Sequence, residues 1–145
     1  MKVIYIASPY TKGDIAANVS VQIEAAHRIL DMGHCPVAPL LSHYLHIHRQ
    51  RPYADWIEMD LALIPKTDIV LRLPGESEGA DREVAKAREC GIVVVFGWEE
   101  LKTFLVYAAL YEAEQKYYEK DTLHSRAKTP DTEGRSPRRI RNPLG

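Results

Sequence analysis

The amino-acid sequence predicts an α/β fold, in which helices cover both faces of a parallel β-sheet. Short apolar runs rich in valine and isoleucine alternate along the chain with longer segments whose apolar residues recur at helical spacing. Most of the short runs are continuously apolar, which is typical of strands buried on both faces. The length of 145 residues fits one domain with a substantial core.

The first half of the chain supplies an opening strand and helix. MKVIYIAS (1–8) predicts a strand, and the polar SPYTKGD that follows predicts a loop. Apolar residues from Ile15 to Met32 recur at helical spacing, and Gly33 ends the pattern. HCPVAP (34–39) predicts a short second strand, and residues 40–51 are ambiguous but favour a helix.

The second half repeats this alternation twice. We expect a helix over 53–66, a strand over 66–75, a helix over 78–90 and a strand over 91–97. The amphipathic segment 98–120 predicts a long final helix. This order of elements is typical of a small doubly wound parallel sheet of the flavodoxin- or Rossmann-like kind.

Charge divides the chain into two parts. Residues 1–119 hold twelve Lys/Arg against seventeen Asp/Glu, whereas residues 120–145 hold seven against three. We therefore expect one α/β domain over 1–119 and a basic, flexible tail over 120–145, because the tail is also rich in Pro, Ser and Gly. An acidic domain argues against a nucleic-acid-binding face, which leaves at most weak contacts through the tail.

The N-terminal sequence and the cysteines indicate in which cellular compartment the protein is found. MKVIYIASPY lacks the features of a signal peptide, and no apolar run approaches the ~20 residues needed to span a bilayer. Cys35 and Cys90 form no CxxC motif, so we expect two buried thiols in a reducing environment. These observations predict a cytoplasmic protein without a membrane partner.

A cluster of acids lies where the third predicted strand meets the next helix. RLPGESEGADREVAKA (72–87) holds four Asp/Glu and two Gly. Acids near a helix start ordinarily complement the helix dipole. In a doubly wound sheet, however, ligands bind at the carboxyl ends of the strands, and this stretch lies there. The loop after the first strand and the region after the second strand share that edge.

Four stretches of the sequence carry a family resemblance when taken in order. They are YIASPY at the first strand, a long helix ending in MGH, WIEMDLALIPKTDIVLRLPG, and SEGADREVAKARECGIVVVF, which together span residues 3–96. This set resembles the nucleoside 2-deoxyribosyltransferase-like superfamily, including its small uncharacterised phage and bacterial branch. The resemblance implies cleavage or exchange of the N-glycosidic bond of a (deoxy)nucleoside or nucleoside 5′-monophosphate, through a covalent glycosyl-glutamate intermediate and without a cofactor.

The same resemblance implies roles for individual residues. Glu83 matches the family's nucleophile, with Ser77 and Gly79 before it in the pattern, and Asp60 matches the residue that handles the base and its proton. The sequence departs from the family where a glycine usually stands two residues before the nucleophile. The implied substrate-binding residues are Tyr5, Ser8, Tyr10, Lys12, Ser77, Gly79 and Asp81, the last of which replaces that glycine.

The chemistry sets different requirements for the two catalytic candidates. A nucleophilic carboxylate must be ionised, and we expect the N-terminus of the helix after 77 to favour the anion of Glu83. The group that protonates the leaving base must keep its proton, and apolar neighbours of Asp60 would raise its pKa. The ordinary alternatives are a dipole-complementing acid and a solvated helix face. Asp81 would raise the pKa of Glu83, crowd the sugar, bind a sugar hydroxyl or point to solvent.

The loop after the first strand offers Ser8, Tyr10, Thr11 and Lys12 just before a helix. Such a loop suits a phosphate or ribose hydroxyls, and a short polar turn is the alternative. Lys12 in the site would favour a nucleoside 5′-monophosphate over a free nucleoside. Arg72 either serves the same purpose or caps the edge of the sheet.

The remaining features bear on metals and partners. HYLHIH places His43 and His46 on one helical face without a further ligand at metal spacing, so we expect substrate-loop or surface histidines and no metal site. The broad apolar and aromatic stripe of the last helix predicts a homo-oligomer, a dimer or higher. Two other functions stay open: a non-catalytic nucleotide-binding or sensing module that uses the same cleft, and an interaction protein that acts through the helix and tail.

Overall fold

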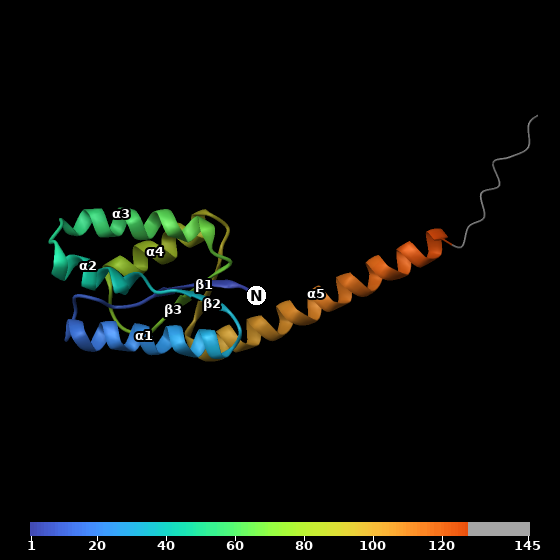
Figure 1. Ribbon diagram of the computed structural model, residues 1–145, viewed down its shortest axis with the longest axis horizontal. Helices are drawn as coiled ribbons and strands as arrows, with labels where there is room; N and C mark the ends of the chain where they lie inside the picture. Colours follow the sequence, from blue (N-terminus) through green and yellow to red (C-terminus); the bar gives the residue numbers. More distant parts are fainter. Residues whose placement is uncertain (128–145) are drawn as a thin grey trace, which may run out of the picture. The chain divides into compact units, whose positions relative to one another are not determined.

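The computed structural model describes residues 1–127, and it describes side chains up to residue 120. The chain divides into two units: a compact one over residues 1–105, and a second that begins at residue 106, of which the structure describes helical residues up to 127. The first unit holds a four-stranded parallel sheet in the order β2-β1-β3-β4 (Figure 1). Its strands are β1 (Val3–Ala7), β2 (Cys35–Val37), β3 (Ile69–Arg72) and β4 (Val93–Phe96).

Helices connect the strands and cover the sheet on both faces. They are α1 (Ile15–Asp31), α2 (Ser42–His48), α3 (Tyr53–Leu63), α4 (Glu78–Glu89) and α5 (Gly97–Ala127), with single 3₁₀ turns η1 (Pro39–Leu41) and η2 (Ile64–Lys66). α1 lies on one face of the sheet, and α3 and α4 lie on the other (Figure 1). The structure therefore confirms the predicted α/β fold with a long final helix.

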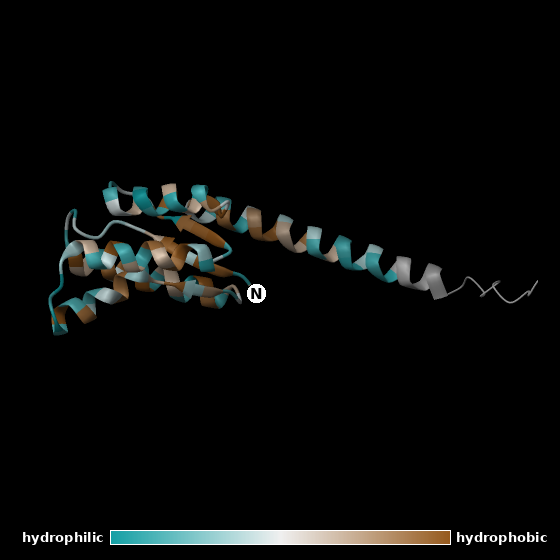
Figure 2. Cartoon of the chain, turned by 90° about the horizontal axis from the view of Figure 1, so that it is seen from above, coloured by the Kyte–Doolittle hydropathy of each residue, from teal (hydrophilic) through white to brown (hydrophobic). Residues whose placement is uncertain are grey.

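Alternating side chains of β1 divide the core into two layers. Ile4 and Ile6 pack with Ile29 of α1 and Leu101 of α5 on one face, whereas Tyr5 and its neighbours pack with α4 and η2 on the other. The strands are the most hydrophobic segments of the first unit (Figure 2). Each fully buried aliphatic side chain of this kind contributes ~1.5–3 kcal/mol to folding.

The helix starts follow from capping residues in the sequence. The Asp14 carboxylate accepts a hydrogen bond from Ala17 N at 3.0 Å and begins α1. The Ser77 hydroxyl accepts one from Ala80 N at 3.2 Å and begins α4. These caps satisfy backbone N–H groups that have no partner inside the helix.

Several sequence predictions need correction. The short second strand predicted over 34–39 is present as β2 over Cys35–Val37, and it tolerates Pro36, which has no N–H to donate, because it is an edge strand. β4 is also an edge strand, so Val93 and Phe96 are partly exposed although the run is fully apolar. Cys90 is exposed and Cys35 half-buried, so the prediction of two buried thiols is wrong. Cys90 lies at the C-cap of α4, beyond the buried face of that helix.

The predicted division at residue 119 stays a prediction. α5 continues to Ala127, beyond the expected end at residue 120, and most of the predicted basic tail lies outside the described residues. The exposed large apolar residues of α5 support the predicted homo-oligomer without testing it: Val106, Tyr107, Leu110, Tyr111, Tyr117 and Tyr118. Within residues 1–127, no helix is both long and apolar enough to cross a membrane.

Candidate active site

A cavity of about 350 Å³ opens at the carboxyl ends of β1 and β3. Its volume suits a small organic ligand. Four segments line it: the loop after β1, the η1–α2 segment, α3, and the start of α4. The fold class predicts ligand binding at this edge of the sheet, and the segments that follow β1, β2 and β3 meet here.

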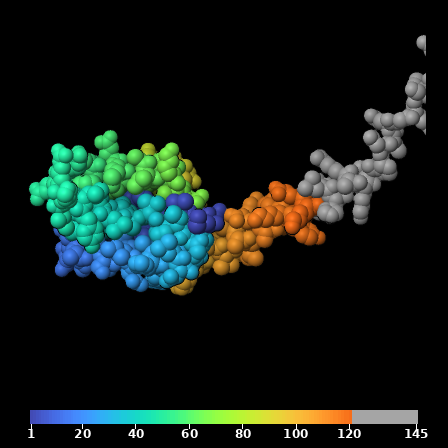
Figure 3. Space-filling view, viewed as in Figure 1, coloured from blue at the N-terminus to red at the C-terminus, as the bar shows by residue number. Residues whose placement is uncertain are grey.

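We distinguish two parts of this cavity. The floor consists of Tyr5, Ser8, Asp60 and Glu83, which are buried, with Tyr5 directly behind Glu83. The rim consists of Tyr10, His43, His46, Tyr53 and Trp56, which are half-buried or exposed. Residues 40–60, which carry most of the rim, form a continuous part of the surface in Figure 3.

Glu83 is the most deeply buried acid of the floor, with 5% of its surface exposed. The Tyr5 hydroxyl donates a hydrogen bond to Glu83 Oε1 at 2.8 Å. Burial raises the pKa of Glu83 to about 8, and the charge of Asp60 raises it as well, whereas the Tyr5 hydrogen bond and the charge of Arg72 lower it. Burial also raises the pKa of the Tyr5 phenol, so this hydroxyl remains a donor.

This pKa corrects one expectation about Glu83. With Ser77 as the N-cap, Glu83 is the sixth residue of α4 and belongs to its second turn, whereas the first-turn acids are Glu78 and Asp81. The effect of a helix dipole falls off within the first turn. Burial therefore governs the ionisation of Glu83, and the helix N-terminus does not hold it as an anion.

Asp60 extends from α3 into the same cavity and is 6% exposed. Burial raises the pKa of Asp60 to about 6, which confirms the expected effect of its apolar neighbours. Its Oδ1 atom is buried without a hydrogen-bond partner among the described residues. Buried polar atoms are nearly always paired, so this oxygen is a natural contact for a proton or a ligand donor.

A buried glutamine holds the loop after β1 in place. Gln22 of α1 donates from Nε2 to Ile6 O at 2.9 Å and to Ser8 Oγ at 2.8 Å, and its Oε1 accepts from Leu40 N at 2.7 Å. Because the Ser8 oxygen already accepts this bond, its hydroxyl hydrogen is the part that a ligand can use. Gln22 could not be predicted as a site residue, since a lone glutamine in a helical pattern gives no signal of burial.

Close packing shapes the start of α4. A Cβ atom on Gly79 would lie 2.8 Å from the Tyr53 hydroxyl and 3.5 Å from Ile57 Cδ1, so a larger residue here would require the Tyr53 ring to move. Gly75 has a φ of +113°, and a Cβ there would lie 2.7 Å from Pro9 Cγ. These two contacts bring the loop after β3 against both α3 and the loop after β1.

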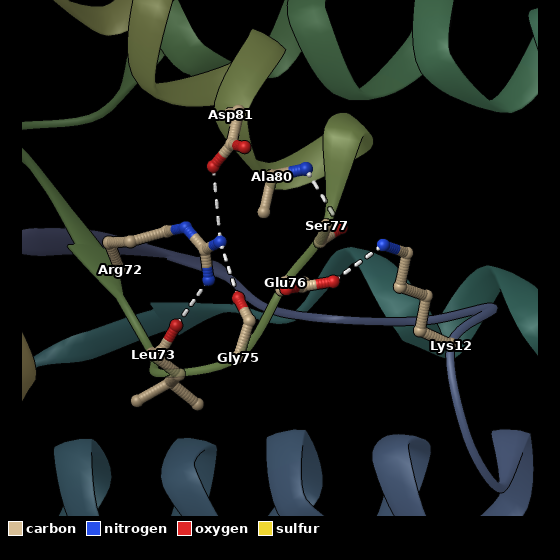
Figure 4. A network of polar contacts seen from close by, with 8 residues as sticks. All are labelled: Lys12, Arg72, Leu73, Gly75, Glu76, Ser77, Ala80 and Asp81. Carbon is tan, nitrogen blue, oxygen red and sulfur yellow. Dashed lines mark hydrogen bonds and ion pairs between the residues drawn. The ribbon is translucent and has the colours of Figure 1, made fainter.

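Three predicted binding residues do not line the cavity: Tyr5, which lies behind Glu83, Lys12 and Asp81. Figure 4 shows the contacts of Lys12 and Asp81. The Lys12 ammonium pairs with Glu76 at 2.7 Å, and both side chains are largely exposed. Asp81 pairs with Arg72 at 3.1 Å, and Arg72 also donates to the carbonyl oxygens of Leu73 and Gly75. Arg72 thus stabilises the turn that follows β3. This role is closer to the predicted capping of the sheet edge than to the binding of an anion.

Four of the five rim residues, all but Tyr10, were not among the residues predicted to bind the substrate. The Tyr10 hydroxyl and His43 Nδ1 are 2.9 Å apart, and their rings meet edge to face. Trp56 Nε1 donates to His46 Nδ1 at 3.1 Å, and these rings also meet edge to face. The signal was present, because HYLHIH and YADW hold aromatic and imidazole rings after the second strand, at the ligand-binding edge.

The described residues hold no group of three or more His, Cys, Asp or Glu arranged for a metal ion. The floor instead offers two carboxyl groups, a phenol and a hydroxyl, and the rim offers flat rings. This set can transfer protons, attack an electrophilic carbon and stack on a planar ligand.

Comparisons with known proteins place the chain in a family without an assigned function. Residues 2–96 match DUF7768, a domain of unknown function, and the chain belongs to this family. No curated protein matches it. A solved structure of a 2-deoxyribosyltransferase from Bacillus psychrosaccharolyticus shares 19% identity with this chain at a TM-score of 0.48. That match covers 65% of this chain and 70% of the other, and it is too distant to assign residues or an activity.

Proposed function

For this member of the DUF7768 family, we propose cleavage or exchange of the N-glycosidic bond of a nucleoside, with Glu83 as nucleophile and Asp60 as acid. The observation that carries the proposal is the meeting of two buried carboxyl groups, from α3 and α4, in one cavity at the carboxyl ends of the strands. The sequence resemblance supports the same two residues through their spacing from Asp68 and Ser77.

The reaction has two balanced steps. First, a carboxylate oxygen of Glu83 bonds to C1′ as the C1′–N bond breaks, and the base nitrogen takes the electron pair and the proton of Asp60. Second, water or the N–H of another base attacks C1′ and gives its proton to Asp60. The Glu83 carboxylate then leaves, and the configuration at C1′ is retained.

The pKa values of Glu83 and Asp60 determine which of the two carboxyl groups holds the proton. The reactive form needs Glu83 ionised and Asp60 protonated, but Glu83 has the higher pKa, so this form is a minority. The Tyr5 hydrogen bond stabilises the anion and increases that minority. The form with one shared proton prevails between pH values of about 6 and 8. We therefore expect a bell-shaped pH profile of kcat/KM, level across that range and falling tenfold per pH unit beyond it.

The lining of the cavity favours an uncharged substrate. Among the described residues, none that lines it is Lys or Arg, and Lys12 pairs with Glu76 instead. A 5′-phosphate would meet two acids without a countercharge. We therefore propose a free nucleoside in preference to a monophosphate, with the Ser8 and Ser77 hydroxyls binding the sugar and the rim binding the base.

Base release tests the proposal. The wild-type protein is incubated with the common nucleosides, deoxynucleosides and their monophosphates, and free base is measured by chromatography. We expect release from an unphosphorylated substrate, lost in Glu83→Ala and kept in the matched control Glu89→Ala, an exposed acid on the same helix. A ligand-dependent rise in melting temperature without any free base would instead identify a binding module.

A further inference from the structure

The rim contains a histidine whose tautomer is fixed by its neighbours. Trp56 Nε1 donates to His46 Nδ1 at 3.1 Å, and the backbone N–H of Arg51 is directed at the same nitrogen at 3.5 Å. Neither an indole nor a backbone N–H can accept a hydrogen bond. Nδ1 must therefore be the acceptor, and the neutral ring carries its hydrogen on Nε2.

The free edge of this ring is available to a ligand. His46 lines the cavity and is half-buried, and no described residue pairs with its Nε2 atom. Trp56 and Tyr53 of α3, together with the Tyr10–His43 pair, supply the other rings of the rim. A flat heterocycle held among these rings would present its edge to a hydrogen-bond donor.

We propose that His46, held as the Nε2–H tautomer by Trp56, donates a hydrogen bond to an acceptor atom on the edge of the base and thereby determines which bases the cavity accepts. This inference rests on the proposed nucleoside substrate. It assigns a specificity role to His46 and a positioning role to Trp56. Both belong to the 40–56 region, outside the floor where the bond is broken.

A single-atom change in the ligand tests the donor. Purines carry acceptors at ring nitrogens N3 and N7, and each can be replaced alone by C–H. Binding of 2′-deoxyadenosine and 2′-deoxyguanosine, and of their 3-deaza and 7-deaza analogues, is measured by calorimetry with the full chain. Glu83→Gln prevents turnover, so that this measurement does not depend on whether the protein releases base.

The expected result is a pattern across ligands and variants. One deaza analogue should bind about tenfold more weakly than its parent, the usual effect of one lost hydrogen bond. His46→Phe in the same background should bind the parent and that analogue equally. His48→Phe, two residues along α2 and exposed, is the matched control and should keep the tenfold difference.

The role of Trp56 has its own readout. Trp56→Phe keeps a ring but removes the indole donor, and we expect the ¹⁵N spectrum of His46 to change from one tautomer to a mixture. Trp98→Phe, on the opposite face of the sheet, should leave that spectrum unchanged. Melting temperatures of all variants confirm that they are folded.

Two results would overturn the inference. One is equal binding of each parent and its analogues to the protein with His46 intact. The other is a difference that persists in His46→Phe. A clear difference that depends on His46, in a protein that releases no base, would support the inference and reject the proposed reaction.

Discussion

The floor and the rim of the cavity are built on different principles. Floor residues are buried: Tyr5 of β1 donates a hydrogen bond to Glu83, and Gln22 of α1 donates one to Ser8. Burial raises the pKa values of Glu83 and Asp60. Rim residues are half-buried or exposed and meet as pairs of rings; Tyr53, for example, is 51% exposed. Under the proposed function, the floor carries the chemistry and the rim determines which ligand is bound.

Two neighbours on α4 show the same contrast over a single turn. The Asp81 side chain is 71% exposed and pairs with Arg72, and it has no part in the cavity. Glu83 is buried behind the Tyr5 hydroxyl. Position on the helix therefore decides which acid is buried, and burial is the largest cause of the raised pKa of Glu83.

The largest expected effect is on how the free energy of unfolding of the protein depends on pH, and it comes from Glu83 in the floor. Glu83 has a folded-state pKa of about 8 against an ordinary value of 4.5, so between these pH values the folded protein holds a proton that the unfolded chain releases. The free energy of unfolding must then fall as pH rises across that window, by ~3–5 kcal/mol. Asp60 adds a smaller effect of the same sign.

Glu83→Gln removes this proton and keeps an acceptor for Tyr5. We expect urea denaturation to show the variant more stable than wild type at pH 8.5, with the advantage disappearing toward pH 4.5. A constant difference between the two proteins at all pH values would show that Glu83 titrates normally.

Asp60→Asn should reduce base release by roughly 10²–10⁴-fold, the usual range for a lost general acid. The loss should be smaller for nucleosides whose base leaves easily without a proton, because the acid is needed least there. Initial rates with good and poor leaving bases measure this. A uniform loss across leaving groups would point to misfolding of the floor instead of acid catalysis.

Tyr5→Phe should reduce kcat/KM about tenfold at pH 7, the effect of one hydrogen bond to a buried charge. The Tyr5 bond lowers the pKa of Glu83, so its loss should move the alkaline limb of the pH profile to higher pH. Rates from pH 5 to 10 check the shift. If the alkaline limb does not move, the group that titrates there is not Glu83.

Gly79→Ala is the smallest change and tests the boundary between floor and rim. Its new methyl group would displace the Tyr53 hydroxyl, which is exposed and free to move. We expect KM to rise by a few-fold with kcat preserved, since uniform binding is lost and the floor is untouched. A fall in kcat alone would place Tyr53 or Gly79 in the chemistry.

Most of the fold could be predicted from the sequence because its patterns are local. Continuous apolar runs identified β1 and β3, and the caps Asp14 and Ser77 stand where their helices begin. The errors came from long-range neighbours. Nothing in GIVVVFG reveals that its strand lies at the edge of the sheet, where Val93 and Phe96 meet solvent.

The candidate site was predictable only in part. The resemblance indicated Glu83 and Asp60, and the structure brings both to one cavity. The resemblance could not indicate the ion-pair partners of Asp81 and Lys12, because these depend on where Arg72 and Glu76 lie in space. The pairing of His46 with Trp56 joins two helices, and sequence spacing carries no information about such a contact.

The central claim is that Glu83 forms a covalent bond with the sugar. Rapid acid quenching of the protein with its best nucleoside, followed by peptide mass spectrometry, tests it most directly. We predict that the mass of the sugar less one water is added to the peptide that contains Glu83, and that Glu83→Ala shows no addition. A glycosyl mass on the peptide that contains Asp60, or base release that persists in Glu83→Ala, would contradict the account.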